Sequence, residues 1–255
     1  MISFTEAQLM TWLSPIIWPF FRVLALFSVA PVFSIRAIPM RVKIGLAFLV
    51  ALSAQATLTG QTIVSVNSPQ AFGTLLQQIG VGLAIGFAVR IVFASVELAG
   101  ELIGLQMGLN FAAFFDPTNN TQTSAVSRFF GHMAILLFVV VNGHLLILMA
   151  VIRSFEAFPV DGNFLEVVQR IRLHELGAEL FASALWIALP MIGFLLFVNL
   201  TLGIISRVAP QMNIYAVGFP VTLATGLIGI AATLPMLDHP MMALMERVID
   251  LFNRR

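Results

Sequence analysis

Side chains able to do chemistry are few and scattered in this sequence. Glu97 and Glu101 stand four residues apart, on one face of a helix, where two carboxylates can act as a paired acid and base. No histidine, metal ligand or nucleophile accompanies them: the four histidines lack ligand spacing, and no GxxxxGK phosphate loop occurs. The sequence therefore predicts no catalytic residue, no metal and no cofactor, and the chain is not expected to be an enzyme.

The composition is that of a protein surrounded by lipid or by other proteins. Of the 255 residues, 59% are hydrophobic and 10% are charged, whereas a soluble domain carries about 25% charged residues. The formal net charge of +1 gives no reason to expect a nucleic-acid partner. Because the chain has no cysteine, disulfides and thiolate sites are excluded.

Long apolar stretches predict an all-α membrane-associated fold of about six helices with kinks. A helix needs about 20 mostly apolar residues to cross a bilayer, and six stretches approach or reach that length. The second of them is short. The stretches are residues 9–33, 44–58, 75–96, 129–152, 180–205 and 217–237.

Charged residues within these stretches are candidates for burial. Arg22 and Arg90 interrupt the first and third stretches, and an arginine at mid-membrane costs at least about 2.5 kcal/mol, so both should face protein or water. Glu97 and Glu101 are buried-charge candidates of the opposite sign. Their partners would be Arg90 or Arg128, or a neighbouring subunit.

Glycines repeat at helical spacing in the third stretch and just after it. Gly82 and Gly86 are four residues apart, as are Gly100, Gly104 and Gly108. This spacing makes a narrow groove that another backbone can approach closely. Two readings stay open: the glycines pack helices within one chain, or they form an interface between subunits.

Residues 106–122 break the helical pattern with phenylalanines followed by a turn signal, Asp-Pro-Thr-Asn-Asn. Non-helical backbone at membrane depth is tolerated only inside protein or beside a water-filled cavity. The segment is therefore either an interfacial turn with aromatic anchors or a plug that excludes water from a pore. Its candidate gate residues are Met107, Leu109, Phe111, Phe114, Phe115, Asp116 and Pro117.

Three further segments are patterned. Residues 164–172 and 241–255 alternate as short amphipathic helices do, and the second suits a membrane interface, a partner groove or a solvated end. The fifth stretch contains Pro190 and is followed by polar and turn-forming residues, which predict a helical hairpin. The residues assigned to its tip are Arg207, Pro210, Gln211, Asn213, Gly218 and Pro220.

Three blocks of sequence resemble the FliR/SctT family of export-gate proteins in type III secretion. They are residues 31–34 (PVFS) with 38–45 (IPMRVKIG), 97–108 (ELAGELIGLQMG) with 114–117 (FFDP), and 207–213 (RVAPQMN) with 218–220 (GFP). The resemblance runs over essentially the whole length. The glycine–glutamate helix that leads into Asp-Pro favours the flagellar branch.

The resemblance implies a structural subunit of a closed helical pore, built with FliP-type and FliQ-type subunits and carrying unfolded flagellar proteins as cargo. It implies a FliP-like part, 1–175, with the plug loop 106–122, and a FliQ-like hairpin with an amphipathic tail, 176–255. It places the protein in the bacterial inner membrane at the flagellar basal body, beside other export-apparatus membrane proteins. The assembled subunits would lie largely above the bilayer plane. The family's plug loop favours the plug reading of 106–122.

A different class of membrane protein is the alternative. A secondary transporter or small channel would use helices broken near Pro190 and Pro220, with Glu97, Glu101 and Arg90 as coupling residues. Inverted repeats would support that reading, and the sequence contains none that is apparent.

Overall fold

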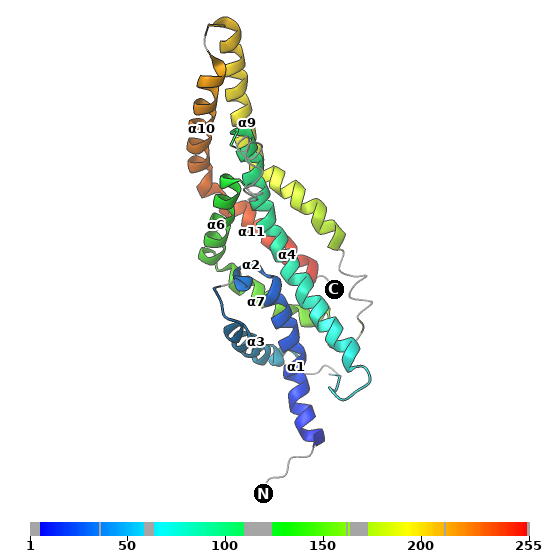
Figure 1. The fold of residues 1–255 in the computed structure, drawn as a ribbon. Coiled ribbons are helices and arrows are strands. Elements are labelled where there is room, and N and C mark those ends of the chain that lie inside the picture. Colours follow the sequence, from blue (N-terminus) through cyan, green and yellow to red (C-terminus); the bar gives the residue numbers. More distant parts are fainter. Residues whose placement is uncertain are drawn as a thin grey trace, which may run out of the picture. The chain divides into compact units, whose positions relative to one another are not determined.

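The fold comes from a computed structural model, which describes residues 6–35, 37–58, 64–109, 124–161, 163, 173–211 and 213–253. Within these ranges the regular elements are all helices, which confirms the predicted all-α fold (Figure 1). The elements are α1 (Glu6–Val29), α2 (Pro31–Ser34), α3 (Met40–Ala54), η1 (Gln55–Leu58), α4 (Ala71–Gln106), α6 (Ala125–Val140), α7 (Gly143–Ala157), α9 (Leu173–Val208), α10 (Ile214–Thr233), η2 (Leu234–Met236) and α11 (Asp238–Asn253).

Four of the described helices are long and apolar enough to cross a membrane, namely α1, α4, α9 and α10. They account for four of the six predicted stretches. Helix α3 has 15 residues, fewer than the roughly 20 that a crossing needs. The stretch 44–58 therefore forms a short apolar helix that ends in a 3₁₀ turn.

The predicted stretch 129–152 is a bent pair of helices, α6 and α7, rather than one straight helix. Asn142 lies at the break with φ 57, a left-handed conformation that asparagine tolerates better than most residues. A Cβ at Gly143 would collide with the ring of Phe138. The dipeptide Asn142–Gly143 is a turn signal. The sequence therefore contained an indication of the break, but the apolar residues on both sides suggested one continuous helix.

The chain divides into two compact units. The first contains Met1–Ile91, Phe138–Leu176 and Met245–Arg255, and the second contains Val92–Leu137 and Gly177–Leu244. This division follows packing density. The predicted division at residues 175 and 176 rests on family resemblance and stays a prediction.

In the first unit, α1 packs against α3. The buried side of α3 consists of Ala47, Ala51 and Ala54, whose spacing places them on one helix face. Small side chains there allow the two helices to approach closely. The other face of α3 leaves large apolar residues such as Leu49 exposed.

In the second unit, α9 and α10 form the predicted hairpin, whose helices run side by side (Figure 1). Pro190 and Pro220 lie inside continuous helices. Asn213 is the N-cap of α10, and its side-chain oxygen accepts a hydrogen bond from the backbone N–H of Ala216 at 3.4 Å.

The amphipathic pattern predicted for the C-terminal tail is confirmed in α11. Its buried side chains include Met241, Met245 and Phe252, whereas Glu246 and Asp250 are exposed. The other predicted amphipathic segment, 164–172, lies outside the described residues.

Candidate functional site

Gly82 and Gly86 of α4 lie against the backbone of α1. A Cβ at Gly82 would overlap the carbonyl oxygen of Arg22, and one at Gly86 would lie 3.0 Å from the carbonyl oxygen of Leu26. Both glycines are buried. This pair therefore packs two helices of one chain, the first of the two readings left open by the sequence.

Arg22 is completely buried, with 0% of its side chain exposed. Its guanidinium joins three helices through hydrogen bonds: Nε donates to Gln78 Oε1 of α4 at 2.8 Å, and Nη1 donates to Ser154 Oγ of α7 at 2.9 Å. Nη2 donates to the carbonyl oxygen of Phe158 at 2.7 Å. The guanidinium carbon lies 3.8 Å from the ring centroid of Phe155, a cation–π contact.

The buried guanidinium of Arg22 hydrogen-bonds to neutral oxygens and contacts an aromatic ring. The nearest acid in the hydrogen-bonded chain is Asp161. Gln78 Nε2 donates to Gln77 Oε1 at 3.3 Å, and Gln77 Nε2 donates to Asp161 Oδ1 at 2.6 Å. A rigid guanidinium fork can use several neutral acceptors at once, so no carboxylate has to be buried beside it.

The glutamines of this network were missed by sequence reasoning. Gln77 and Gln78 are adjacent amides near the start of α4, and both are buried. Buried amides require hydrogen-bond partners. Their place one helical turn before Gly82 was the available signal.

Helices α4 and α6 are joined through a second close contact in the second unit. A Cβ at Gly100 would lie 2.9 Å from the Cα of Ser127, and Ser127 Oγ donates to the carbonyl oxygen of Glu97 at 2.8 Å. The backbone N–H of Ser124 donates to Glu101 Oε2 at 3.0 Å. Glu101 therefore anchors the start of α6, which is a structural role.

Two of the four buried-charge candidates are exposed on the single chain. Arg90 and Glu97 lie on the surface, Glu101 is half-buried, and only Arg22 is enclosed. Glu97 lies beside α6, since its Oε1 would lie 2.9 Å from a Cβ added at Gly131. Burial of Arg90 and Glu97 against a neighbouring subunit stays a prediction.

Gly108 ends α4. It has φ 78, and its N–H donates to the carbonyl oxygen of Leu105 at 3.0 Å. The N–H of Leu109 donates to the carbonyl oxygen of Gly104 at 3.1 Å. These two bonds and the left-handed glycine make a Schellman C-cap. Gly104 and Gly108 thus terminate the helix at the point where the predicted plug begins.

Only the first two predicted gate residues fall within the described residues. Met107 is completely buried and Leu109 is half-buried. The others lie outside the described residues: Phe111, Phe114, Phe115, Asp116 and Pro117.

The predicted hairpin-tip residues surround the turn between α9 and α10. Arg207 lies in the last turn of α9, while Pro210 and Gln211 follow it, and all three are exposed. Gly218 and Pro220 lie within α10, beyond the turn itself. The tip is therefore polar and short.

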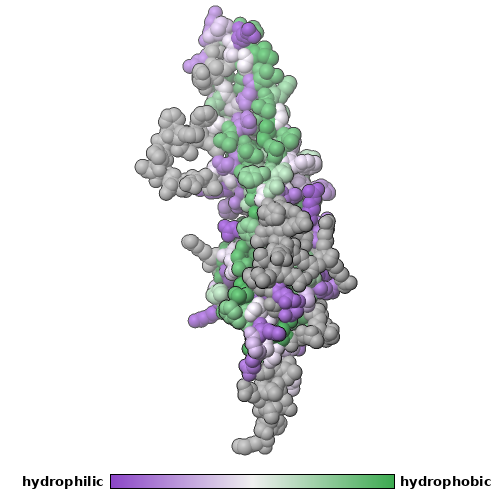
Figure 2. Space-filling view, turned by 90° about the vertical axis from the view of Figure 1, so that its right-hand side faces the viewer, coloured by the Kyte–Doolittle hydropathy of each residue, from purple (hydrophilic) through white to green (hydrophobic). Residues whose placement is uncertain are grey.

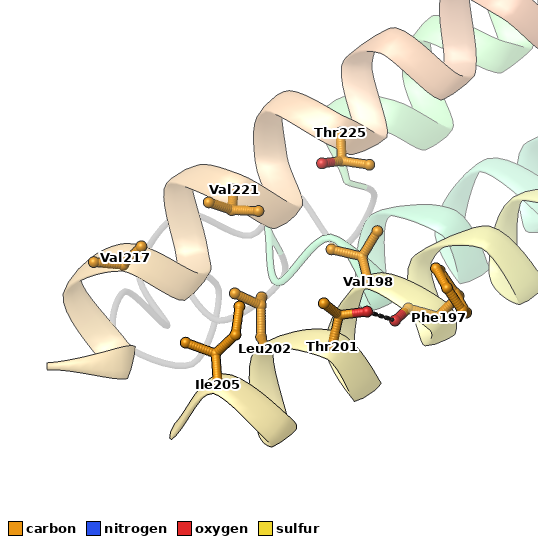
Figure 3. Close-up of a pocket in the computed structure, with 8 residues that line it drawn as sticks. All are labelled: Phe197, Val198, Thr201, Leu202, Ile205, Val217, Val221 and Thr225. Carbon is orange, nitrogen blue, oxygen red and sulfur yellow. Dashed lines mark hydrogen bonds between the residues drawn. The ribbon is translucent and has the colours of Figure 1, made fainter. Parts of the chain in front are cut away.

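An apolar groove runs between the hairpin helices (Figure 3). Its volume is about 420 Å³, and Thr201 in its wall donates its hydroxyl to the carbonyl oxygen of Phe197 at 2.9 Å. In Figure 2 the hairpin, uppermost in the view, is largely hydrophobic, with hydrophilic residues at its end. The lining residues are Phe197, Val198, Thr201, Leu202, Ile205, Val217, Val221 and Thr225.

Comparison with known proteins decides the family. The model of the bacterial export proteins, family 1, matches residues 13–248. The chain belongs to this family. The flagellar biosynthetic protein FliR of Pectobacterium carotovorum subsp. carotovorum is 41% identical over 251 residues, which cover 98% of this chain and 96% of that protein.

FliR proteins of other bacteria are also similar to the chain. That of Escherichia coli (strain K12) is 40% identical over 93% of this chain and 90% of its own length. That of Bacillus subtilis (strain 168) is 30% identical, covering 82% of each. The resemblance to the FliR/SctT family is confirmed, and this family 1 export protein is an inner-membrane component of the flagellar export apparatus.

Proposed function

We propose that the chain is a structural subunit of the export gate, which forms a closed pore with FliP-type and FliQ-type subunits and has no catalytic role. Supporting this is the apolar surface that the chain leaves uncovered. Only 33% of the α9 span and 22% of the α10 span are buried, against 67% for α4. Trp186, Phe197 and Val208 are 75%, 67% and 79% exposed. Such faces require companion helices or lipid.

Helix length supports a position partly beyond the bilayer core. Helices α4 and α9 have 36 residues each, which corresponds to about 54 Å at 1.5 Å per residue. The hydrocarbon core is only about 30 Å thick. Both helices therefore extend well outside it or tilt strongly, as subunits of a raised assembly would, beside other export-apparatus membrane proteins.

The continuity of α9 and α10 removes the two helix breaks on which the transporter alternative relied. A secondary transporter binds its substrate where helices are interrupted. Pro190 and Pro220 lie inside unbroken helices, so neither proline creates such an interruption.

Within this gate, the segment that follows Gly108 acts as the plug. Helix α4 ends in a left-handed glycine cap, and the next residues carry Phe111, Phe114 and Phe115. Aromatic side chains in a narrow conduit exclude water and therefore ions without a charged gate. An entering unfolded flagellar protein displaces them.

Deletion of residues 109–118 is expected to raise ion leakage through the assembled complex severalfold, because the apolar seal is lost while the packing helices stay intact. The measurement is ion flux through the purified complex in liposomes, together with the amount of complex recovered. Replacing the same residues by a Gly/Ser linker of equal length controls for chain connectivity and should leak equally. Unchanged flux in a fully assembled complex would remove the plug role.

Purification in mild detergent tests the subunit assignment separately. A pore subunit should be recovered with two other small membrane proteins, and the intact mass of the complex should exceed that of this chain alone. A chain that is recovered alone, stable and conducting a small solute would support the transporter alternative and contradict the proposal.

A further inference from the structure

We infer that Met107 is the positioning residue of the plug, because it fixes the start of that segment to Gly226 of the C-terminal hairpin. The inference rests on the proposed plug role of the residues that follow Gly108. It assigns a function to a contact between the residue that directly follows α4 and helix α10, which joins residues far apart in the sequence.

The side chain of Met107 lies flat against the backbone of Gly226. A Cβ at Gly226 would lie 2.6 Å from both Cγ and Cε of Met107 and 2.7 Å from its Sδ. Met107 is completely buried, with 0% exposed. Because Cγ lies close to its own backbone, Met107 cannot swing aside for an added methyl group as a side-chain tip would.

Helix α10 has glycines where methionines approach it. Gly229, almost one turn after Gly226, faces Met191 of α9, whose Sδ and Cε would lie 2.7 Å from an added Cβ. Gly218 on the same helix has only Leu202 nearby, at 3.9 Å. Glycine weakens a helix interior, so Gly226 and Gly229 are explained by the two methionine contacts.

The contact is rigidly connected to the start of the plug. Met107 directly precedes Gly108, and the bonds of Gly108 to Leu105 and of Leu109 to Gly104 hold residues 108 and 109 against the end of α4. A displacement of α10 past Met107 therefore moves residues 108 and 109.

Gly226→Ala tests the inference through leakage. In the complete complex it should raise ion flux severalfold while the complex is recovered in normal amount. Gly203→Ala, at an α9 position with nothing within 4 Å of an added Cβ, should leave flux unchanged. Met107→Ala removes the side chain that fixes the contact and should also raise ion flux. Because alanine at position 107 leaves room for the methyl group added at position 226, the double variant should leak no more than Met107→Ala alone. Normal flux in Gly226→Ala, or additive leakage, would overturn the inference.

A reversible cross-link separates positioning from simple packing. The chain has no native cysteine, so Met107→Cys with Gly226→Cys introduces one oxidisable pair. Oxidation should form the disulfide in the assembled complex and reduce export without raising leakage, and reduction should restore export. The two single-cysteine variants control for the substitutions. Absence of the disulfide, or a disulfide that leaves export unchanged, contradicts the inference even if Gly226→Ala impairs assembly.

The two proposals fail differently. If deletion of residues 109–118 leaves flux unchanged, the plug itself is wrong. If that deletion leaks but Gly226→Ala does not, the plug stands and only the positioning role of Met107 is lost.

Discussion

Arg22→Met is expected to destabilise the protein by about 3 kcal/mol or more, because each buried polar group left without its partner costs about 1–3 kcal/mol. The groups that lose a donor are Gln78 Oε1, Ser154 Oγ and the carbonyl oxygen of Phe158. Methionine keeps most of the volume and the apolar stem. The loss of stability therefore measures the hydrogen bonds of the guanidinium and its cation–π contact with Phe155.

The measurement is the thermal unfolding of the protein in detergent, compared with that of Arg153→Met. Arg153 lies on α7, the helix that carries Ser154, but it is exposed, and surface substitutions usually change stability by less than about 0.5 kcal/mol. The unfolding temperature of Arg22→Lys should lie between those of Arg22→Met and Arg153→Met, since an ammonium group cannot reproduce the planar fork of the guanidinium. If Arg22→Met unfolds at the same temperature as the wild-type protein, the hydrogen-bond network contributes nothing to stability.

Gly82→Ala should destabilise the protein by about 3 kcal/mol, the upper part of the range for overpacking a core. The added methyl group would overlap the carbonyl oxygen of Arg22 and lie 2.9 Å from the Cβ of Ala25. A carbonyl oxygen and a Cβ cannot rotate away as a long side chain can. Helices α1 and α4 must therefore separate, which also stretches the bond between Arg22 and Gln78.

Gly45→Ala is the matched control for this substitution. Gly45 lies in α3 with nothing within 4 Å of an added Cβ, so alanine there should stabilise the helix by up to about 1 kcal/mol. The same chemical change is thus expected to have opposite signs at two positions of one unit. Equal unfolding temperatures for Gly82→Ala and Gly45→Ala would refute the close approach of α1 and α4.

Both predictions concern one residue of α1. The side chain of Arg22 bonds to Gln78, and its carbonyl oxygen faces Gly82, one turn further along α4. The glycine allows the close approach of the two backbones, and that approach brings the guanidinium within reach of the amide. The closeness of the helices and the burial of the charge therefore depend on each other.

Local pattern was enough to predict the helical class, the positions of four long apolar helices, the α9–α10 hairpin and the amphipathic α11. These features follow from runs, periodicity and turn residues that lie close together in the chain. The glycine spacing also indicated where α4 packs closely. The glycine spacing did not decide whether Gly82 and Gly86 contact their own chain or another subunit, because spacing describes a helix face and not its partner.

Tertiary structure alone decided the partners. The acceptors for Arg22 lie 56, 132 and 136 residues away in the sequence. Gly226 meets Met107, which directly follows α4. Any apolar helix here can pack against several others, so composition cannot select among them. The selection is made by backbone approach at glycine and by the need of each buried donor for an acceptor, conditions that are satisfied only when the helices have come together.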